Sequence, residues 1–331
     1  MFQALTRIGR RRALQGSAAA LVVLGLLMWW LLPFGTDSPG GRLSFSTGVP
    51  TGVYQTYGTM LKEVLAEDLP HVSVSLQTSE GSGQNISRVA TGKADFALAT
   101  ADSVDDYIRN DRPGSDRLRG CARLYDDYIQ LVVADTSKVH RAHDLRKLSV
   151  AVGQEGSGVR LIAERILRAA GLDPHKDITP VAAGIDTAPR LLEEGKIDAF
   201  FWSGGLPTTA VRLLTERFPV RIVPLDDLVT ALHRSGESTR YYRSAVMPAD
   251  AYPAARNGGS VPTLAVANIL ITADRTDVRL TEDFTRTVIR SRDSIGRQVH
   301  AAQLVDVRTA IYTDPLPLHE GARRYYRSVK P

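Results

Sequence analysis

Glycine and hydroxyl residues gather at four places in the chain, each between a predicted strand and a predicted helix. Glycine lets backbone N–H groups approach a ligand closely, and Ser and Thr hydroxyls add hydrogen-bond donors. The positive end of each following helix dipole favours negative charge at the same place. Such loops are suited to binding a small anion. The four loops are Ser46–Gly52 (STGVPTG), Thr78–Asn85 (TSEGSGQN), Gly153–Gly158 (GQEGSG) and Trp202–Pro207 (WSGGLP).

Glycine and serine are also common at strand-to-helix turns for steric reasons, and for a single loop that explanation is sufficient. Four loops at equivalent positions favour a ligand site, because the carboxyl ends of parallel strands meet at one edge of a sheet. Residues 153–160 (GQEGSGVR) lack the Gly-Lys-Ser/Thr ending of a P-loop, and no G-x-G-x-x-G opens a helix after the first strand. Nucleotide ligands are therefore disfavoured.

The sequence contains little that would support catalysis or metal binding. The segment around Ser157 lacks the first glycine of a G-x-S-x-G elbow, and the seven histidines are scattered. The single cysteine, Cys121, excludes an intrachain disulfide and a zinc site of paired cysteines. The acidic pairs Asp105-Asp106 and Asp126-Asp127 are interpreted as solvated faces. We therefore expect no catalytic residue, no metal and no cofactor.

The elements that must position the four loops alternate between strand and helix. This alternation predicts an α/β sheet with crossover helices, in two lobes with a ligand cleft between them. Residues 225–262 are predicted to be irregular, and Pro207 is predicted in the first turn of its helix. The first lobe is predicted to comprise 42–135 plus 243–331, and the second 136–242. Strands are predicted at 42–46, 71–77, 95–99, 131–134, 148–152, 178–181, 197–201, 220–223 and 264–273, and helices at 54–67, 85–92, 158–170, 188–194, 207–217 and 282–297.

The N-terminal residues 1–41 predict a cytoplasmic tail, a membrane helix and a linker. Residues 17–34 carry no charge over 18 positions, close to the ~20 residues that span a bilayer. Four arginines precede this stretch and should hold its near end in the cytoplasm, which places the body outside. No A-x-A-like cleavage site follows, so we expect a retained single-pass anchor, with secretion after cleavage as the alternative.

The charge distribution argues against a nucleic-acid partner. The formal net charge is +5, yet residues 1–40 contain four Arg and one Asp, which leaves +2 on the rest of the chain. No basic run interleaved with aromatic residues occurs there. A body with so little positive charge offers no surface for tracking phosphates.

Read in order, short segments across residues 43–327 resemble the TAXI family, the solute-binding subunits of tripartite ATP-independent periplasmic (TRAP) transporters. This resemblance implies a type II periplasmic-binding-protein fold that closes on a small organic anion, such as a glutamate-like amino acid or a dicarboxylate. It also implies delivery of that solute to a TRAP-type membrane permease. The matching segments are 46–58 (STGVPTGVYQTYG), 79–86 (SEGSGQNI), 92–99 (GKADFALA), 144–158 (DLRKLSVAVGQEGSG), 195–207 (GKIDAFFWSGGLP), 251–253 (AYP) and 317–326 (PLHEGARRYY).

The same resemblance implies which residues contact the solute. Departures from the family pattern bear on the ligand: Val53 follows Gly52 where a second glycine is common, and Val159 replaces a threonine hydroxyl. Glu80 adds a negative charge, so if it points inward a zwitterion or a neutral solute fits better than an anion. The implied ligand-binding residues are Gly52, Tyr54, Ser82 and Asn85 from one lobe and Ser157, Gly158, Val159, Ser203 and Gly204 from the other.

The sequence therefore predicts an extracytoplasmic solute-binding protein that works by hinge closure on its ligand. One alternative is a membrane-anchored sensor or adaptor that uses the same cleft without transport. Another is an enzyme of the pyrimidine-precursor-synthase kind on the same fold. The absence of a catalytic Cys/His cluster in the sequence counts against the enzyme.

Overall fold

One mixed sheet runs through residues 40–329, the part of the chain that the computed structural model describes. Eight of its strands follow the order β2-β1-β3-β10-β4-β7-β5-β6, while β8 pairs with β4 and β9 with β10. The strands are β1 Gly41–Ser46, β2 Val72–Gln77, β3 Phe96–Thr100, β4 Leu118–Ala134, β5 Ser149–Ala151, β6 Thr179–Val181, β7 Ala199–Gly204, β8 Val220–Val223, β9 Arg243–Met247 and β10 Val261–Ala273.

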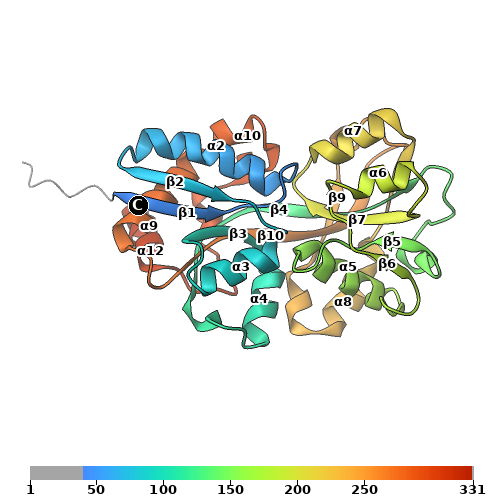
Figure 1. Cartoon of the computed structure of the whole chain (residues 1–331), viewed down its shortest axis with the longest axis horizontal. Helices are drawn as coiled ribbons and strands as arrows, with labels where there is room; N and C mark the ends of the chain where they lie inside the picture. Colours follow the sequence, from blue (N-terminus) through green and yellow to red (C-terminus); the bar gives the residue numbers. More distant parts are fainter. Residues whose placement is uncertain (1–39, 330–331) are drawn as a thin grey trace, which may run out of the picture. The chain divides into compact units, whose positions relative to one another are not determined.

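Helices cover the two ends of this sheet. In Figure 1, β1–β3 lie with α2, α3, α4, α9, α10 and α12 at one end, which we call the first lobe, and β5–β7 lie with α5–α8 at the other, the second lobe. The helices are α2 Val53–Asp68, α3 Ser82–Ala90, α4 Ala101–Arg109, α5 Gly158–Ala169, α6 Ala188–Glu193, α7 Thr209–Arg217, α8 Val229–Ser235, α9 Val278–Arg290, α10 Arg292–Gly296, α11 Val307–Ala310 and α12 Glu320–Val329.

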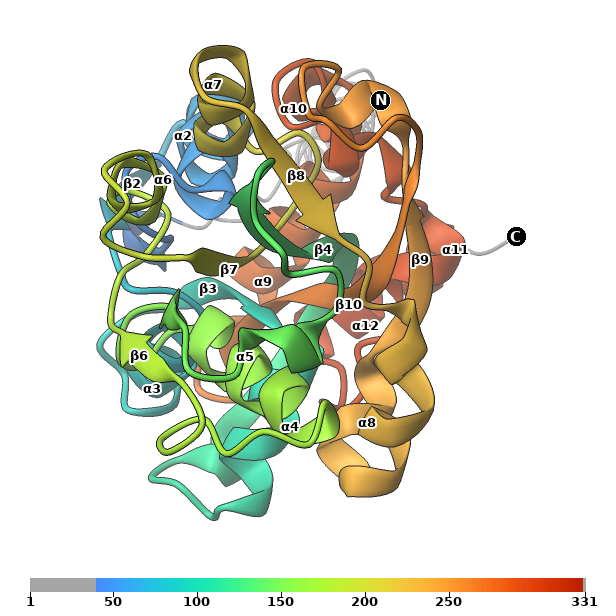
Figure 2. The same cartoon turned by 90° about the vertical axis from the view of Figure 1, so that its right-hand side faces the viewer.

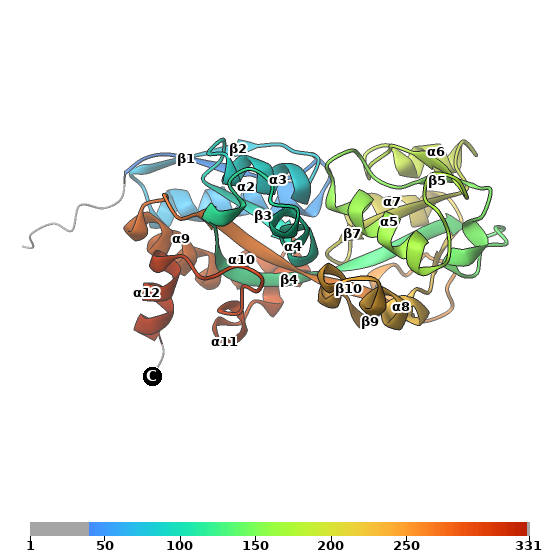
Figure 3. The same ribbon diagram turned by 90° about the horizontal axis from the view of Figure 1, so that it is seen from below.

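Two long antiparallel strands, β4 and β10, connect the lobes. The 17 residues of β4 pair with β10 along their first part and with β7 and β8 further on. The 13 residues of β10 pair with β9 near their start and with β3 near their end. Figure 3 shows both strands passing from one lobe to the other. Residues near the middle of these strands therefore lie where the two lobes meet.

Each lobe has its own apolar core on both faces of the sheet. In the first lobe Phe96 stacks on Phe284 with ring centroids 4.2 Å apart, and Phe45 packs edge-on against the same ring. In the second lobe, Phe200 and Phe201 are adjacent in β7 and enter different clusters, because successive strand side chains point to opposite faces. Figure 2 views this lobe end-on, with α7 on one side of β7 and α5 on the other.

Most predicted elements are confirmed within a residue or two, and the exceptions have physical causes. The 17 residues of β4 were predicted only at 131–134, because Arg119, Arg123 and the acidic pair at 126–127 interrupt its apolar pattern. The segment predicted as irregular contains α8, β9 and the start of β10. Helix α7 begins at Thr209, so Pro207 precedes it rather than forming its first turn. The helix predicted at 282–297 is two helices, α9 and α10, and α4 and α12 were not predicted.

The predicted membrane helix at 17–34 lies outside the described residues. Within residues 40–329, no helix combines the length and apolar character needed to span a bilayer. The predicted lobe boundaries fall just after β4 and just before β9. Because the described body forms one compact unit of contacts, the division at those residues stays a prediction.

Candidate functional site

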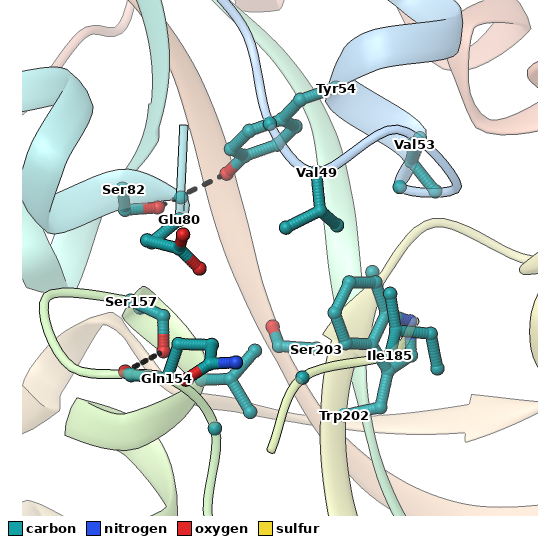
Figure 4. Close-up of a pocket in the computed structure, with 18 of the residues that line it drawn as sticks. Val49, Val53, Tyr54, Glu80, Ser82, Gln154, Ser157, Ile185, Trp202 and Ser203 are labelled. Atoms are coloured by element: carbon teal, nitrogen blue, oxygen red, sulfur yellow. Dashed lines mark hydrogen bonds between the residues drawn. The ribbon is translucent and has the colours of Figure 1, made fainter. Parts of the chain in front are cut away.

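The four glycine- and hydroxyl-rich loops surround one pocket between the lobes. Its empty volume is about 630 Å³ including the open mouth, within the ~300–1,000 Å³ typical of small-molecule sites. Figure 4 shows Tyr54, Ser82 and Glu80 on one side and Gln154, Ser157, Trp202 and Ser203 on the other. The lining residues are Gly48, Val49, Gly52, Val53, Tyr54, Glu80, Gly81, Ser82, Thr100, Asp127, Gly153, Gln154, Ser157, Gly158, Val159, Gly184, Ile185, Trp202, Ser203 and Gly204.

Eight of the nine predicted ligand-binding residues line this pocket, and Asn85 does not. The Asn85 side chain is fully buried beneath α3. Its amide nitrogen donates to the carbonyl oxygens of Thr47 (2.7 Å) and Leu98 (2.8 Å), and its amide oxygen accepts from the Ser46 hydroxyl at 2.7 Å. The side chain ties α3 to β1 and β3 and has no group directed at a solute. Its predicted role as a ligand contact is therefore corrected to a structural one.

Two helices begin at the pocket, one from each lobe. Helix α5 is capped by Ser157, whose hydroxyl oxygen accepts from the Arg160 backbone N–H at 3.1 Å and donates to the Gln154 carbonyl at 2.7 Å. Helix α3 starts at Ser82, whose oxygen accepts from the Thr100 backbone N–H at 3.1 Å. The free backbone N–H groups of a helix's first turn favour hydrogen-bond acceptors at these two edges of the pocket.

The two helix starts are in contact across the pocket rim. The Gln84 backbone N–H donates to the Gly156 carbonyl oxygen at 3.1 Å, which joins the lobes directly. A Cβ atom on Gly83 would lie 2.4 Å from that same carbonyl oxygen, so only glycine permits this approach. Further round the rim, the Thr51 hydroxyl donates to the Asp186 carboxylate. The structure therefore presents the lobes in a closed arrangement.

A chain of hydrogen bonds crosses the pocket floor and ends at Asp127. The Tyr54 hydroxyl donates to the Asn268 amide oxygen, so its contact with the Ser82 hydroxyl (3.3 Å) must be donated by Ser82. The Asn268 amide nitrogen donates to Asp127 Oδ1 at 2.7 Å. From the second lobe, the Ser203 hydroxyl lies 3.4 Å from Asp127 Oδ2. The floor thus links both lobes through one carboxylate on β4.

The register of the two long strands explains this placement. Asp126 and Asp127 are consecutive in β4, so their side chains point to opposite faces of the sheet. The pairing of β4 with β10 shifts register around Asn268, and such an irregularity redirects a side chain. Asp126 contacts Arg123 and Arg243, whereas Asp127 faces the pocket.

Burial changes the acid–base properties of the floor. Asp127 is 3% exposed, and its burial, partly offset by the Asn268 hydrogen bond, raises its pKa to about 7. Burial, followed by the nearby charge of Asp127, also raises the pKa of Tyr54, which keeps its hydroxyl protonated as a donor. Asp127 therefore changes charge near neutral pH.

The sequence analysis interpreted Asp126 and Asp127 as a solvated face, and the structure corrects this. Asp105 is also buried, at 4% exposed, so the first acidic pair was only half solvated. Reasoning from sequence also missed Thr100, Gly184 and Ile185 as lining residues. The Tyr-x-Asp spacing at Tyr125 and Asp127 fits one face of a strand, but the charged residues around it obscured the strand itself.

The ionisable side chains of the pocket lining are all acidic or phenolic. It contains two acidic side chains, Glu80 and Asp127, but no Lys, Arg, His or Cys. Glu80 lies on the first-lobe side with its carboxylate toward the pocket interior (Figure 4). Among residues 40–329, no group of three or more His, Cys, Asp or Glu is arranged to hold a metal ion.

The fold is that of the periplasmic binding proteins. A structure titled a putative L-cystine ABC transporter from Listeria monocytogenes matches with a TM-score of 0.50 and 12% identity, covering 80% of this chain and 98% of that one. An ancestral arginine-binding protein bound to arginine matches with a TM-score of 0.50 and 15% identity, over 78% and 98%. The periplasmic aliphatic sulphonate binding protein SsuA from Escherichia coli matches with a TM-score of 0.48 and 16% identity, covering 89% of this chain and 84% of that one.

The chain belongs to the NMT1-like family, whose model matches residues 45–329. The predicted periplasmic-binding-protein fold is thereby confirmed, and the finer assignment to the TAXI family stays a prediction.

Proposed function

We propose that this protein is an extracytoplasmic solute-binding protein that closes its lobes around one small solute and presents it to a membrane transporter. The observation that carries the proposal is the convergence of loops from both lobes on one pocket whose rim is bridged by the Gln84–Gly156 hydrogen bond. A ligand that contacts both lobes only when they are closed shifts the population toward the closed form. Such closure is what a transporter partner can recognise.

The finer proposal is that the transporter is of the TRAP type and that residues 1–41 anchor the protein to the membrane. It is supported by the TAXI-like segments and by the uncharged stretch at 17–34. An organic anion is the ligand class that the TAXI resemblance implies, and the first turns of α3 and α5, which begin at the pocket, favour negative charge there. The two pocket carboxylates oppose it, since like charges placed together without a cation are costly.

A binding screen on the full-length chain tests the core of this proposal. Thermal unfolding is followed with small dicarboxylates, amino acids, 2-oxo acids, primary amines and polyols. A compound present at ~100 times its dissociation constant stabilises the folded state by about 2.7 kcal/mol. We expect at least one class to raise the melting temperature selectively, and a flat response to every class would contradict the proposal.

Lobe closure is tested with Gly83→Ala and the compound that binds best. The added methyl would lie 2.4 Å from the Gly156 carbonyl oxygen, so it opposes the closed rim. We expect about tenfold weaker affinity, equivalent to ~1.4 kcal/mol. Gly259→Ala is the matched control, because its Cβ would meet nothing within 4 Å and lies outside the pocket. Equal affinities for the two variants would contradict binding by closure.

A further inference from the structure

Asp127 is a buried carboxylate without a cationic partner inside the pocket. It is 3% exposed and makes no ion pair with any Lys, Arg or His of residues 40–329. Its two hydrogen bonds come from neutral groups, Asn268 and Ser203, and the second is long at 3.4 Å. Oδ2 therefore retains the capacity to accept a stronger, charge-assisted hydrogen bond. Buried carboxylates are ordinarily paired, whereas both donors to Asp127 within the described residues are neutral.

The surroundings of Asp127 supply no positive group from the protein. The titratable groups that interact electrostatically with it are Tyr54 from α2, Tyr125 and Asp126 from β4, and Asp102 from α4, none of which can carry a positive charge. Glu80 adds a second carboxylate nearer the mouth. The pocket lining therefore has two acidic and no basic side chains, and a further carboxylate brought by a solute would add to the repulsion.

A second observation is the state of Tyr125, two residues before Asp127 and on the same face of β4. Its side chain is 1% exposed, and its hydroxyl has no hydrogen-bond partner within the described part of the chain. Burial and the charge of Asp127 raise the pKa of this hydroxyl, so it stays protonated. Asp127 and its buried neighbour Tyr125 thus both have unused hydrogen-bonding capacity, and of the two only Asp127 lines the pocket.

The rest of the lining defines the body of the solute. Apolar side chains surround the space above the floor, and the aromatic face of Trp202 is favourable for both apolar groups and cations. The amide of Gln154 also lines the pocket and can bind a polar substituent, whereas the hydroxyl protons of Ser82 and Ser157 are already donated to Tyr54 and to the Gln154 carbonyl. The apolar lining residues are Val49, Val53, Val159, Ile185 and Trp202.

We propose that the pocket takes a small solute with a protonated amine, which pairs with the Asp127 carboxylate while its apolar body packs against the valine, isoleucine and tryptophan side chains. This inference rests on the proposed solute-binding function and names the solute class of that same pocket. The ammonium N–H groups donate to Asp127 Oδ2, and the hydrogen bond from Asn268 holds Oδ1 in place.

The test compares three probes of one shape: pentylamine, pentan-1-ol and pentanoate. Calorimetric titration of the full-length chain at pH 8, where Asp127 is ionised, should give a dissociation constant for pentylamine at least tenfold below those of the other two. In Asp127→Asn the affinity for pentylamine should fall roughly 100-fold, because truncating one partner of a buried charge pair has effects of that order.

Asp126→Asn is the matched control. It makes the same change one residue away, on the opposite face of β4, where the carboxylate contacts Arg123 and Arg243 instead of the pocket. It should leave pentylamine binding unchanged. Equal loss of binding in both variants, or none in Asp127→Asn, would overturn the role of Asp127.

The outcomes separate this inference from the proposed function. Binding of pentanoate without pentylamine would overturn the amine inference and leave a solute-binding protein for acids. Absence of binding by all three probes, together with a flat response in the wider screen, would overturn both. Circular dichroism of each variant confirms that it is folded, and Asn is nearly isosteric with Asp.

Discussion

Two buried carboxylates at the junction of the lobes have opposite surroundings. Asp102 on α4 lies beside Arg165 of α5, whose guanidinium nitrogens are 3.1 Å from Asp102 and 3.0 Å from Asp106. Tyr242 donates to the same Asp102 oxygen at 2.6 Å. Asp127, on the pocket floor, is as deeply buried but has only Asn268 and Ser203 as partners.

This difference distinguishes a structural charge from a functional one. At the α4–α5 contact the protein supplies its own cation, so the charge of Asp102 is balanced without a solute. At the pocket floor no Lys, Arg or His of the described residues pairs with Asp127. Burial therefore disfavours the charged form of the carboxyl and raises its pKa. This contrast is the basis of our proposal that the ligand supplies the positive group that pairs with Asp127.

The largest expected effect is on the paired side of this comparison. Arg165→Met should lower the free energy of unfolding by about 4 kcal/mol, because removing one partner leaves Asp102 buried without its cation. Urea denaturation of the full-length chain measures the loss. The control, Arg168→Met on the same helix, removes a pair with Glu164 from an arginine side chain that is 52% exposed, and should change stability by about 0.5 kcal/mol. Similar losses for the two variants would contradict a structural role for Arg165.

A smaller effect of opposite sign is expected for the unpaired carboxylate. The pKa of Asp127 is raised from 3.8 in the unfolded chain to about 7 in the folded protein. The folded state therefore binds this proton more tightly, which adds to the free energy of unfolding below pH ~4. The contribution is lost as the pH rises from ~4 through ~7. The shift alone corresponds to at most about 4 kcal/mol. Because an amide accepts the Asn268 and Ser203 hydrogen bonds less strongly than a carboxylate, we expect Asp127→Asn to gain about 2 kcal/mol at pH 8 and almost nothing at pH 4.5.

Urea denaturation of the ligand-free protein at the two pH values measures this gain. Asp126→Asn serves again as the control and should lose stability, since Arg123 and Arg243 lose a partner. An Asp127→Asn variant that is less stable than the parent chain at pH 8 would show that the carboxylate is stabilising in the empty pocket, and would remove the contrast with Asp102.

The sequence predicted the loops of this site far better than its floor. Gly52, Ser82 and Ser157 lie at helix starts and Ser203 lies at the end of β7. Glycine and serine mark such places in short local patterns that the sequence shows directly. The position of Asp127 depends on residues far away in the sequence, because β4 pairs with β10 and β7. This pairing buries Asp127 beside Asn268 of β10. Its neighbours Arg123 and Asp126 made the segment look solvated, although they neutralise each other on the other face.

Asn85 shows the converse error. It follows Ser82 in a glycine-rich loop and so was expected to face the ligand, but α3 turns it inward. There its amide forms hydrogen bonds with Ser46 at the end of β1, with Thr47 just after it and with Leu98 of β3. The composition of the loops therefore predicted where the pocket lies, but it did not predict which side chains of α3 point into it.

The most direct test of the central claim is the direction of proton exchange on binding. Calorimetric titration of the full-length chain with pentylamine at pH 7, in phosphate and in Tris, measures the protons exchanged from the difference in heat. Because Asp127 has a pKa of about 7, pairing it with an ammonium should release about half a proton per solute and make binding about tenfold tighter at pH 8 than at pH 6. Proton uptake on binding, with tighter binding at pH 6, would contradict the claim, because it would mean that Asp127 meets its solute as a neutral acid.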